Sequence, residues 1–104
     1  MRNLYIIAYD VVNDRRRSKI HDLLRSYGTA VQYSLFLCPL SEGERMRLRS
    51  EIWPHLSLDE DRILIADLGP TEKRGMDAIE TWGAELNPLI PVASLTTNRA
   101  ARIV

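Results

Sequence analysis

Hydrophobic positions along the chain predict two buried strands and a helix between them. The runs 4–9 and 62–68 are short, apolar and rich in β-branched or aromatic residues, as buried strands are. Over 14–27, apolar residues recur every three or four positions, which predicts an amphipathic helix. The residues of its apolar stripe are Ile20, Leu23, Leu24 and Tyr27.

Capping and turn residues indicate where the helices begin and end. Asn13 or Asp14 can cap the first helix, and Gly28 directly after it suits a helix end. The spacing from Ser41 to Glu44 matches a capping box and predicts the start of a second helix. The apolar side of this helix and the proline that ends it are Met46, Leu48, Ile52, Trp53 and Pro54.

The segment 30–37 is the remaining extended region. Its alternation puts Val31 and Leu37 on one face and Phe36, with polar neighbours, on the other. The sequence leaves open whether 29–40 forms one long bent strand or a tight hairpin.

The order of elements predicts an α+β fold, a small antiparallel sheet with two helices on one face. A ferredoxin-like sheet needs a fourth strand beyond the three that are clear. The length of 104 residues favours one domain, 1–104. Within it 70–104 is a less regular tail, in which 76–82 suits a short helix and 100–104 a last edge strand.

Both faces of this sheet carry apolar side chains. On strands 4–9 and 62–68 the side chains of both faces are apolar. In a sheet with one solvent-exposed face, apolar and polar residues alternate along each strand. Because two helices cover only one face, we expect a homodimer packed sheet against sheet, in which each tail can add an edge strand to the partner. The alternative is that 70–98 folds back over the second face of the same chain.

Composition is that of a globular domain, with 45% hydrophobic and 27% charged residues. The single cysteine, Cys38, excludes a disulfide framework, a zinc knuckle and an iron–sulfur site. With no apolar run of membrane-spanning length and no export cleavage pattern, we expect a cytoplasmic protein. The net charge is zero, but residues 1–50 carry nine Lys/Arg against five Asp/Glu, a basic half that suits phosphate.

Asp10 ends the first buried strand, where the chain opens into a loop. A carboxylate there is a hard oxygen ligand that suits Mg²⁺ or Mn²⁺. One Asp per chain supplies few ligands for a metal site, but in a dimer two copies of Asp10 could share one ion. Such an ion would activate water for attack on a phosphodiester. The alternative is a turn residue that bonds nearby backbone amides.

Four basic residues follow in the first turns of the helix. Cations at a helix N-terminus oppose the helix dipole, so the cluster suggests a bound anion such as the phosphate of a nucleic acid. At 100° per residue, Arg16 aligns with the apolar stripe and points toward the end of the sheet that carries Asp10. The alternative is a solvated basic face. The candidate nucleic-acid-binding residues are Arg15, Arg16, Arg17 and Lys19.

Other candidates carry less weight. His21 and His55 lack neighbours at metal-ligand spacing and are expected on the surface, and Cys38 is expected to be inert. Tyr9 and Phe36 could stack on bases, but a place in the dimer interface is favoured for both. Further cations, expected on solvated surfaces or as extra phosphate contacts, are Arg45, Arg47, Arg49, Lys73 and Arg74.

Several motifs, taken in order, resemble those of the small CRISPR-associated endonuclease, the lesser of the two universal spacer-acquisition proteins. No single motif is diagnostic, but together and at close spacing they are specific. The similarity covers about 3–70 well and the tail loosely. The motifs are Tyr9-Asp10-Val11, then Arg15, Arg17 and Lys19, then Tyr27-Gly28, and VQYSLF at 31–36.

The resemblance implies a ferredoxin-like homodimer in which Asp10 of each protomer is the catalytic residue and holds Mg²⁺. It implies cleavage of single-stranded RNA or double-stranded DNA, and insertion of new spacers into a CRISPR array together with dimers of the CRISPR integrase. In that complex the residues matching Arg15, Arg17 and Lys19 lie along the DNA, whereas Arg16 is an addition to the pattern.

A non-catalytic DNA-binding scaffold of the integration complex stays open as the alternative, because no general base such as a histidine adjoins Asp10 in the sequence. A regulatory ferredoxin-like dimer and a similarly folded toxin ribonuclease are further alternatives. The basic start of the helix weighs against a regulatory role.

Overall fold

The computed structural model describes residues 1–84, which form a four-stranded antiparallel sheet with the strand order β2-β3-β1-β4. The predicted last strand at 100–104, and its pairing with a partner, lie outside the described residues. The strands are β1 (Asn3–Asp10), β2 (Thr29–Gln32), β3 (Leu35–Leu40) and β4 (Arg62–Pro70). The helices are α1 (Asp14–Arg25), α2 (Glu42–Ile52), the 3-10 turn η1 (Trp53–His55) and α3 (Arg74–Asp77).

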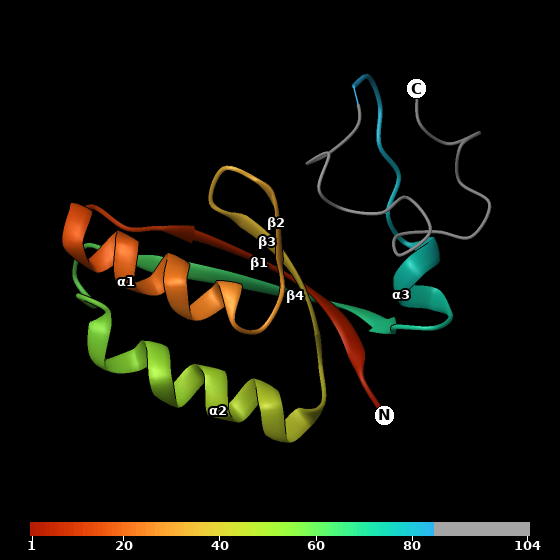
Figure 1. Ribbon diagram of the computed structural model, residues 1–104, viewed down its shortest axis with the longest axis horizontal. Coiled ribbons are helices and arrows are strands. Elements are labelled where there is room, and N and C mark those ends of the chain that lie inside the picture. Colours follow the sequence, from red (N-terminus) through yellow and green to blue (C-terminus); the bar gives the residue numbers. More distant parts are fainter. Residues whose placement is uncertain (85–104) are drawn as a thin grey trace.

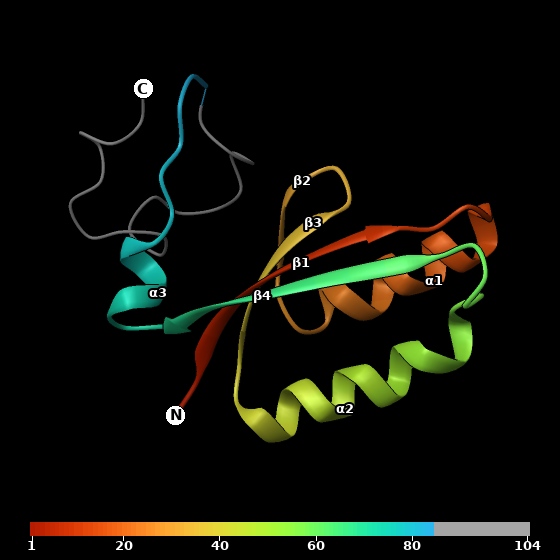
Figure 2. The same cartoon turned by 180° about the vertical axis from the view of Figure 1, so that it is seen from behind.

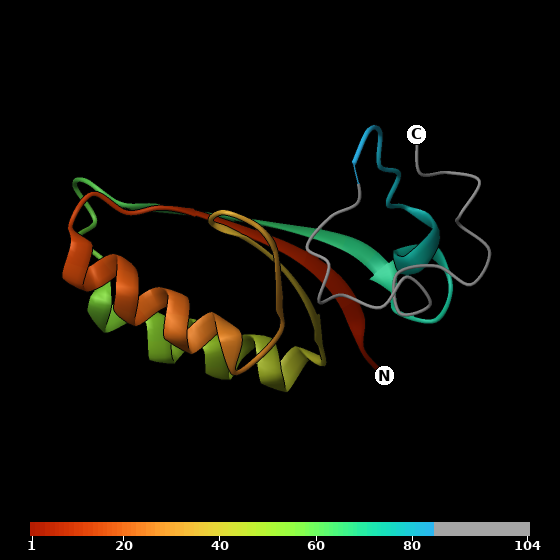
Figure 3. The same cartoon turned by 45° about the horizontal axis from the view of Figure 1, so that its top comes forward.

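The two long helices, α1 and α2, lie side by side on one face of the sheet (Figure 1). Seen from behind, the sheet lies in front of both helices (Figure 2), and the tilted view shows the two layers (Figure 3). This order and layering confirm the predicted ferredoxin-like α+β fold.

The segment 29–40 is a hairpin, which answers the question that the sequence left open. Its turn is Tyr33–Ser34, and Ser34 has a left-handed backbone with φ 62°. The predicted alternation holds, because Val31 and Leu37 lie on one face of the sheet and Phe36 lies on the other. The face of Phe36 is the one that the helices cover, where it is buried in the core with Tyr9, so only the expectation of polar surroundings for Phe36 is wrong.

The predicted caps are present. The Asn13 side chain accepts a hydrogen bond from the Arg16 amide at 2.9 Å, so Asn13 is the cap of α1. At the start of α2, Ser41 Oγ accepts from the Glu44 amide at 3.1 Å, and Glu44 Oε1 accepts from the Ser41 amide at 2.8 Å. Gly28 is needed for a different reason than the one predicted, since its φ is not positive. A Cβ there would lie 2.3 Å from the carbonyl oxygen of Leu37.

The core fills the space between the sheet and the helices. Phe36, Ile20 and Leu24 are fully buried there, and burial raises the pKa of the Cys38 thiol to about 12. On α2, Leu48 and Ile52 are buried as predicted. Met46 and Trp53 are exposed instead, and the Arg49 guanidinium lies 4.5 Å from the centroid of the Trp53 ring.

The second face of the sheet is partly covered by the chain itself. Leu4, Val31 and Leu37 are buried on that face, and Ile79, just after α3, packs against them. The alternative in which the segment after 70 folds back is thus realised in part, with α3 shorter and earlier than the predicted helix. On the edge strand β4, Leu64 stays 61% exposed. Among residues 1–84, no helix has the length and apolar character needed to cross a membrane.

Candidate nucleic-acid interface

Asp10 is the last residue of β1 and pairs in register with Arg62, the first residue of β4. Its carboxylate is exposed and has no hydrogen-bond or ion-pair partner among residues 1–84. A turn residue would bond nearby backbone amides, so the turn interpretation has no support in the described part of the chain. The carboxylate is available to a ligand from outside.

Two of the four predicted cations at the start of α1 are unpaired. Arg15 and Lys19 are exposed, and neither forms an ion pair or a hydrogen bond with the described residues. Both lie on the helix that begins four residues after Asp10, so two free positive charges adjoin the end of β1. This is the arrangement expected for contact with phosphates.

Arg17 is tied to the loop that follows Asp10. Its Nη1 donates to the carbonyl oxygen of Val11 at 2.8 Å, and its Nη2 forms an ion pair with Asp14. These contacts hold the guanidinium against the backbone of the β1–α1 loop. Its charge remains half-exposed at the same end of the sheet.

Arg16 reaches the predicted end of the sheet and is engaged there by a buried carboxylate. Arg16 Nε donates to Asp61 Oδ2 at 2.8 Å, and Nη2 donates to Asp61 Oδ1 at 3.2 Å. A second, exposed carboxylate, that of Glu60, lies 3.3 Å from Nη2. Contact of Arg16 with nucleic acid stays a prediction, and the structure adds a second role, that of joining α1 to the loop before β4.

Asp61 is the residue of this site that sequence reasoning missed. Besides Arg16, it accepts hydrogen bonds from the amides of Val12 at 3.0 Å and Ser57 at 2.9 Å. Arg16 and these amides hold the pKa of Asp61 well below its usual range, with the Arg16 hydrogen bond as the largest cause. Its partner Arg16 is 45 positions away in the sequence, so no local spacing signals the pair.

An aromatic cluster lies near the end of β1 and joins Tyr9 to His21 of α1 and Phe36 of β3. The Tyr9 hydroxyl and His21 Nδ1 are hydrogen-bonded at 3.0 Å, and the His21 ring meets Phe36 edge-on at 5.2 Å between centroids. His21 is therefore half-buried and hydrogen-bonded to Tyr9, and not the surface residue that was predicted. Burial is the main cause that raises the pKa of Tyr9.

The predicted interface role does not fit the Phe36 side chain. Phe36 is fully enclosed within one chain, and Tyr9 is 9% exposed. A side chain with no accessible surface cannot contact a partner, so the prediction is wrong for Phe36, and Tyr9 keeps only a small accessible edge. The exposed Leu64 and the partly covered second face are better interface candidates.

A metal site formed within one chain is not present among residues 1–84, which contain no group of three or more potential ligands. Asp10 offers an exposed carboxylate without a partner among residues 1–84 at this end of the sheet. Mg²⁺ retains most of its water and needs only one or two protein carboxylates, so a single Asp from each of two chains fits its requirements.

One protein-family model matches most of this chain. The model described as CRISPR associated protein Cas2 matches residues 2–76. The chain belongs to the Cas2 family. This confirms the resemblance inferred from the motifs between Tyr9 and Phe36.

Known relatives and structures agree with the assignment to Cas2. A protein of Synechocystis sp. named CRISPR-associated endoribonuclease Cas2 3 is 38% identical over 80 residues, 77% of this chain and 84% of that protein. The crystal structure of a hypothetical protein from Thermus thermophilus matches with TM-score 0.65 at 39% identity, over 66% of this chain and 84% of that one. A chain of a partial Cas6-RT-Cas1–Cas2 complex matches with TM-score 0.62 at 27% identity, over 86% of this chain and 98% of that one.

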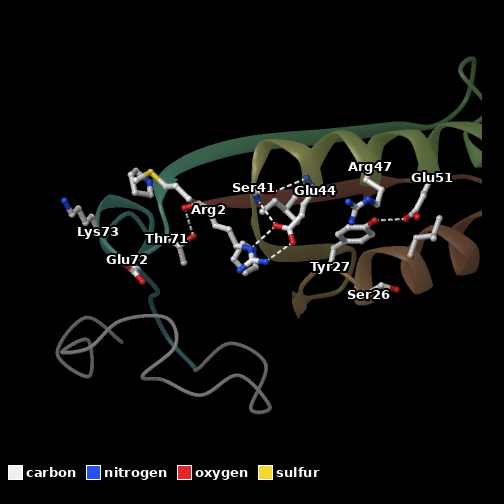
Figure 4. A pocket seen from close by; sticks show the side chains of 15 residues that line it. Arg2, Ser26, Tyr27, Ser41, Glu44, Arg47, Glu51, Thr71, Glu72 and Lys73 are labelled. Carbon is white, nitrogen blue, oxygen red and sulfur yellow. Dashed lines mark hydrogen bonds and ion pairs between the residues drawn. The ribbon is translucent and has the colours of Figure 1, made fainter.

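This Cas2-family chain has a hollow at the end of the sheet opposite Asp10, where β1 begins and β3 and β4 end (Figure 4). In it the Arg2 guanidinium donates to both oxygens of Glu44, each at 2.8 Å. Lys73 lies here and Arg74 just beyond, after β4. The length of β4, about 25 Å at the usual rise per residue, therefore separates them from Asp10.

Proposed function

We propose that this Cas2-family chain is a metal-dependent endonuclease that hydrolyses phosphodiester bonds of single-stranded RNA or double-stranded DNA. The observation that carries the proposal is the exposed carboxylate of Asp10 at the end of β1, followed on α1 by Arg15 and Lys19, all three without a partner among residues 1–84. The name endoribonuclease given to the Synechocystis relative supports the reaction type. The proposed location is the cytoplasm.

Asp10 is the residue that would hold Mg²⁺, with Mn²⁺ as the alternative ion. When bound, such an ion lowers the pKa of a coordinated water and offsets negative charge on the phosphodiester. The protein's own part is to bind and orient the strand. Arg15 and Lys19 would attract its phosphates, while Arg17, fixed by the Val11 carbonyl, would help to hold the loop after Asp10.

The proposed assembly is a homodimer that also binds dimers of the CRISPR integrase in spacer acquisition. The apolar second face and the exposed Leu64 on β4, the outer strand of the described sheet, support self-association. In a dimer that brings the two β1 ends together, two Asp10 carboxylates could share one ion. The Cas1–Cas2 complex among the similar structures supports the integrase partner.

The test compares Asp10→Ala with Asp59→Ala, a change at an exposed loop carboxylate. Both proteins are incubated with labelled single-stranded RNA and duplex DNA over a range of Mg²⁺ and Mn²⁺ concentrations. We expect cleavage by the wild type and Asp59→Ala, and none by Asp10→Ala or in EDTA. Equal cleavage by Asp10→Ala would show that Asp10 is not the catalytic ligand.

A non-catalytic DNA-binding scaffold is the second candidate, favoured by Arg15 and Lys19, which are unpaired among residues 1–84, and by the lack of a group of three or more potential metal ligands in that part of the chain. Replacing both Arg15 and Lys19 by Ala should weaken duplex binding and reduce the slope of log K against log salt by about one unit for each. Arg25→Ala, at the other end of α1, is the control. An unchanged slope in the double variant would remove both residues from the DNA-binding surface.

A further inference from the structure

A smaller hollow lies between α1 and the β2–β3 hairpin, and we call it the hairpin pocket. Its volume of about 520 Å³ falls within the range of about 300–1,000 Å³ that is usual for small-ligand sites. The amide of Tyr9 donates to the carbonyl oxygen of Ser34 at 3.1 Å, so the hairpin turn lies against β1 one residue before Asp10. The lining residues that matter here are Tyr9, Arg17, His21, Gln32, Tyr33 and Ser34.

Aromatic rings form much of this pocket. Tyr33, on the turn, is 91% exposed, so almost all of its aromatic ring is open to a ligand. Deeper in, Tyr9 and His21 form an edge-on pair with centroids 6.4 Å apart. Flat aromatic surfaces of this kind are where unpaired nucleobases stack, because every base has a π-face.

Polar groups without partners surround the rings. The Gln32 amide, the Asp22 carboxylate and His21 Nε2 form no hydrogen bond with the described residues, since only Nδ1 of His21 is bonded to Tyr9. An amide offers both a donor and an acceptor, which matches the mixed edge of a base. The half-exposed guanidinium of Arg17 lines the same hollow and adds positive charge for the adjoining phosphate.

We propose that the hairpin pocket holds one unstacked nucleobase of a single-stranded nucleic acid whose backbone passes Asp10. The base stacks on Tyr33 and its edge meets Gln32 and His21. Bases of a duplex are paired and stacked, and reach such a pocket only at the cost of unstacking. The pocket therefore favours single strands over duplexes. The proposal rests on the proposed nuclease function and adds the substrate form to it.

The experiment uses the full chain in EDTA, so that nothing is cleaved. The protein is titrated with a short single-stranded RNA, with the matching sugar-phosphate strand that lacks bases, and with a duplex of the same sequence. The chain has two histidines, so ring resonances in NMR spectra report on His21, with His55 as an internal control. We expect His21 to shift with the base-containing strand only, and His55 to stay in place.

Affinity measurements test the stacking residue. Stacking on one aromatic residue is worth about 5- to 100-fold in affinity, so Tyr33→Ala should weaken binding of the single strand by that factor and leave the strand without bases unaffected. Tyr33→Phe should bind as the wild type does. Trp82→Ala, which removes another exposed aromatic ring in the segment after α3, should also leave binding unchanged.

Three results would overturn the pocket proposal. One is equal affinity for strands with and without bases. Another is unchanged affinity in Tyr33→Ala while Asp10→Ala still abolishes cleavage, which would leave the nuclease proposal intact. The third is a Tyr33→Ala variant that loses self-association in light scattering but not RNA affinity, which would assign the pocket to a protein partner. Absence of both binding and cleavage would instead reject the proposed function.

Discussion

Removal of the buried Asp61 carboxylate should destabilise this fold far more than removal of its neighbour Glu60. The Asp61 side chain is fully buried and accepts hydrogen bonds from Val12, Ser57 and Arg16. Glu60 meets the same arginine at 3.3 Å, but its side chain is 54% exposed. Both variants, Asp61→Ala and Glu60→Ala, remove one negative charge beside Arg16, but only Asp61 is buried. Comparing them therefore separates the effect of burial on stability from the effect of charge.

The magnitude follows from what Asp61→Ala leaves behind. Two backbone amides lose their acceptor, at about 1–3 kcal/mol each. Arg16 also loses its main partner, but its side chain is 28% exposed and keeps Glu60, so this loss adds little. We take about 3 kcal/mol as the expected loss, which lowers Tm by about 12–24 °C in a domain of this size. For Glu60→Ala we expect a loss of about 0–1 kcal/mol, as for other surface pairs.

Thermal and urea unfolding of the three proteins measure these values, and pH gives a second test. Since the pKa of Asp61 is lowered in the folded state, its contribution is fully present above the unfolded pKa and declines as pH falls toward the folded value. The stability difference between wild type and Asp61→Ala should therefore shrink below about pH 4. Equal losses in Asp61→Ala and Glu60→Ala, or a difference that does not vary between neutral and acid pH, would refute the reasoning.

Two further predictions concern the core. Gly28→Ala should lower the free energy of unfolding in urea by about 1–3 kcal/mol, because its Cβ would overlap the Leu37 carbonyl and the Cys38 sulfur. Gly43→Ala, whose Cβ would have nothing within 4 Å, should stabilise α2 by up to about 1 kcal/mol. An unchanged free energy of unfolding in Gly28→Ala would contradict the close approach. The Cys38 thiol is fully buried and its pKa is raised to about 12, so it should react with a thiol reagent only as the protein unfolds. Modification as fast in native buffer as in urea would disprove its burial.

The elements that the sequence predicted well are those with strong local signals. β1 and β4 are continuous apolar runs, and α1 and α2 carry caps whose hydrogen bonds the structure contains. The hairpin was left open because the turn Tyr33–Ser34 has neither glycine nor asparagine, the residues that favour a left-handed backbone. The alternation put Val31 and Leu37 on one face and Phe36 on the other, as in the structure, but it gave no sign of which face the helices cover.

The site was predictable only in part, for a related reason. Asp10, Arg15 and Lys19 lie within one strand, loop and helix start, so local sequence brings them together. The partners of Arg16 and Tyr9 come from folding, since Asp61 and His21 are separated from them by 45 and 12 positions. No periodicity or motif encodes such pairs in a single sequence.

The central position of β1 has a consequence for how the chain is made. β1 is the first strand to leave the ribosome, yet its two neighbours are β3 and β4. Until synthesis has passed Pro70, at least one edge of this apolar strand has no native partner. Such an edge invites pairing with other nascent chains, so translation that stalls between the two helices and β4 yields products that depend on chaperones.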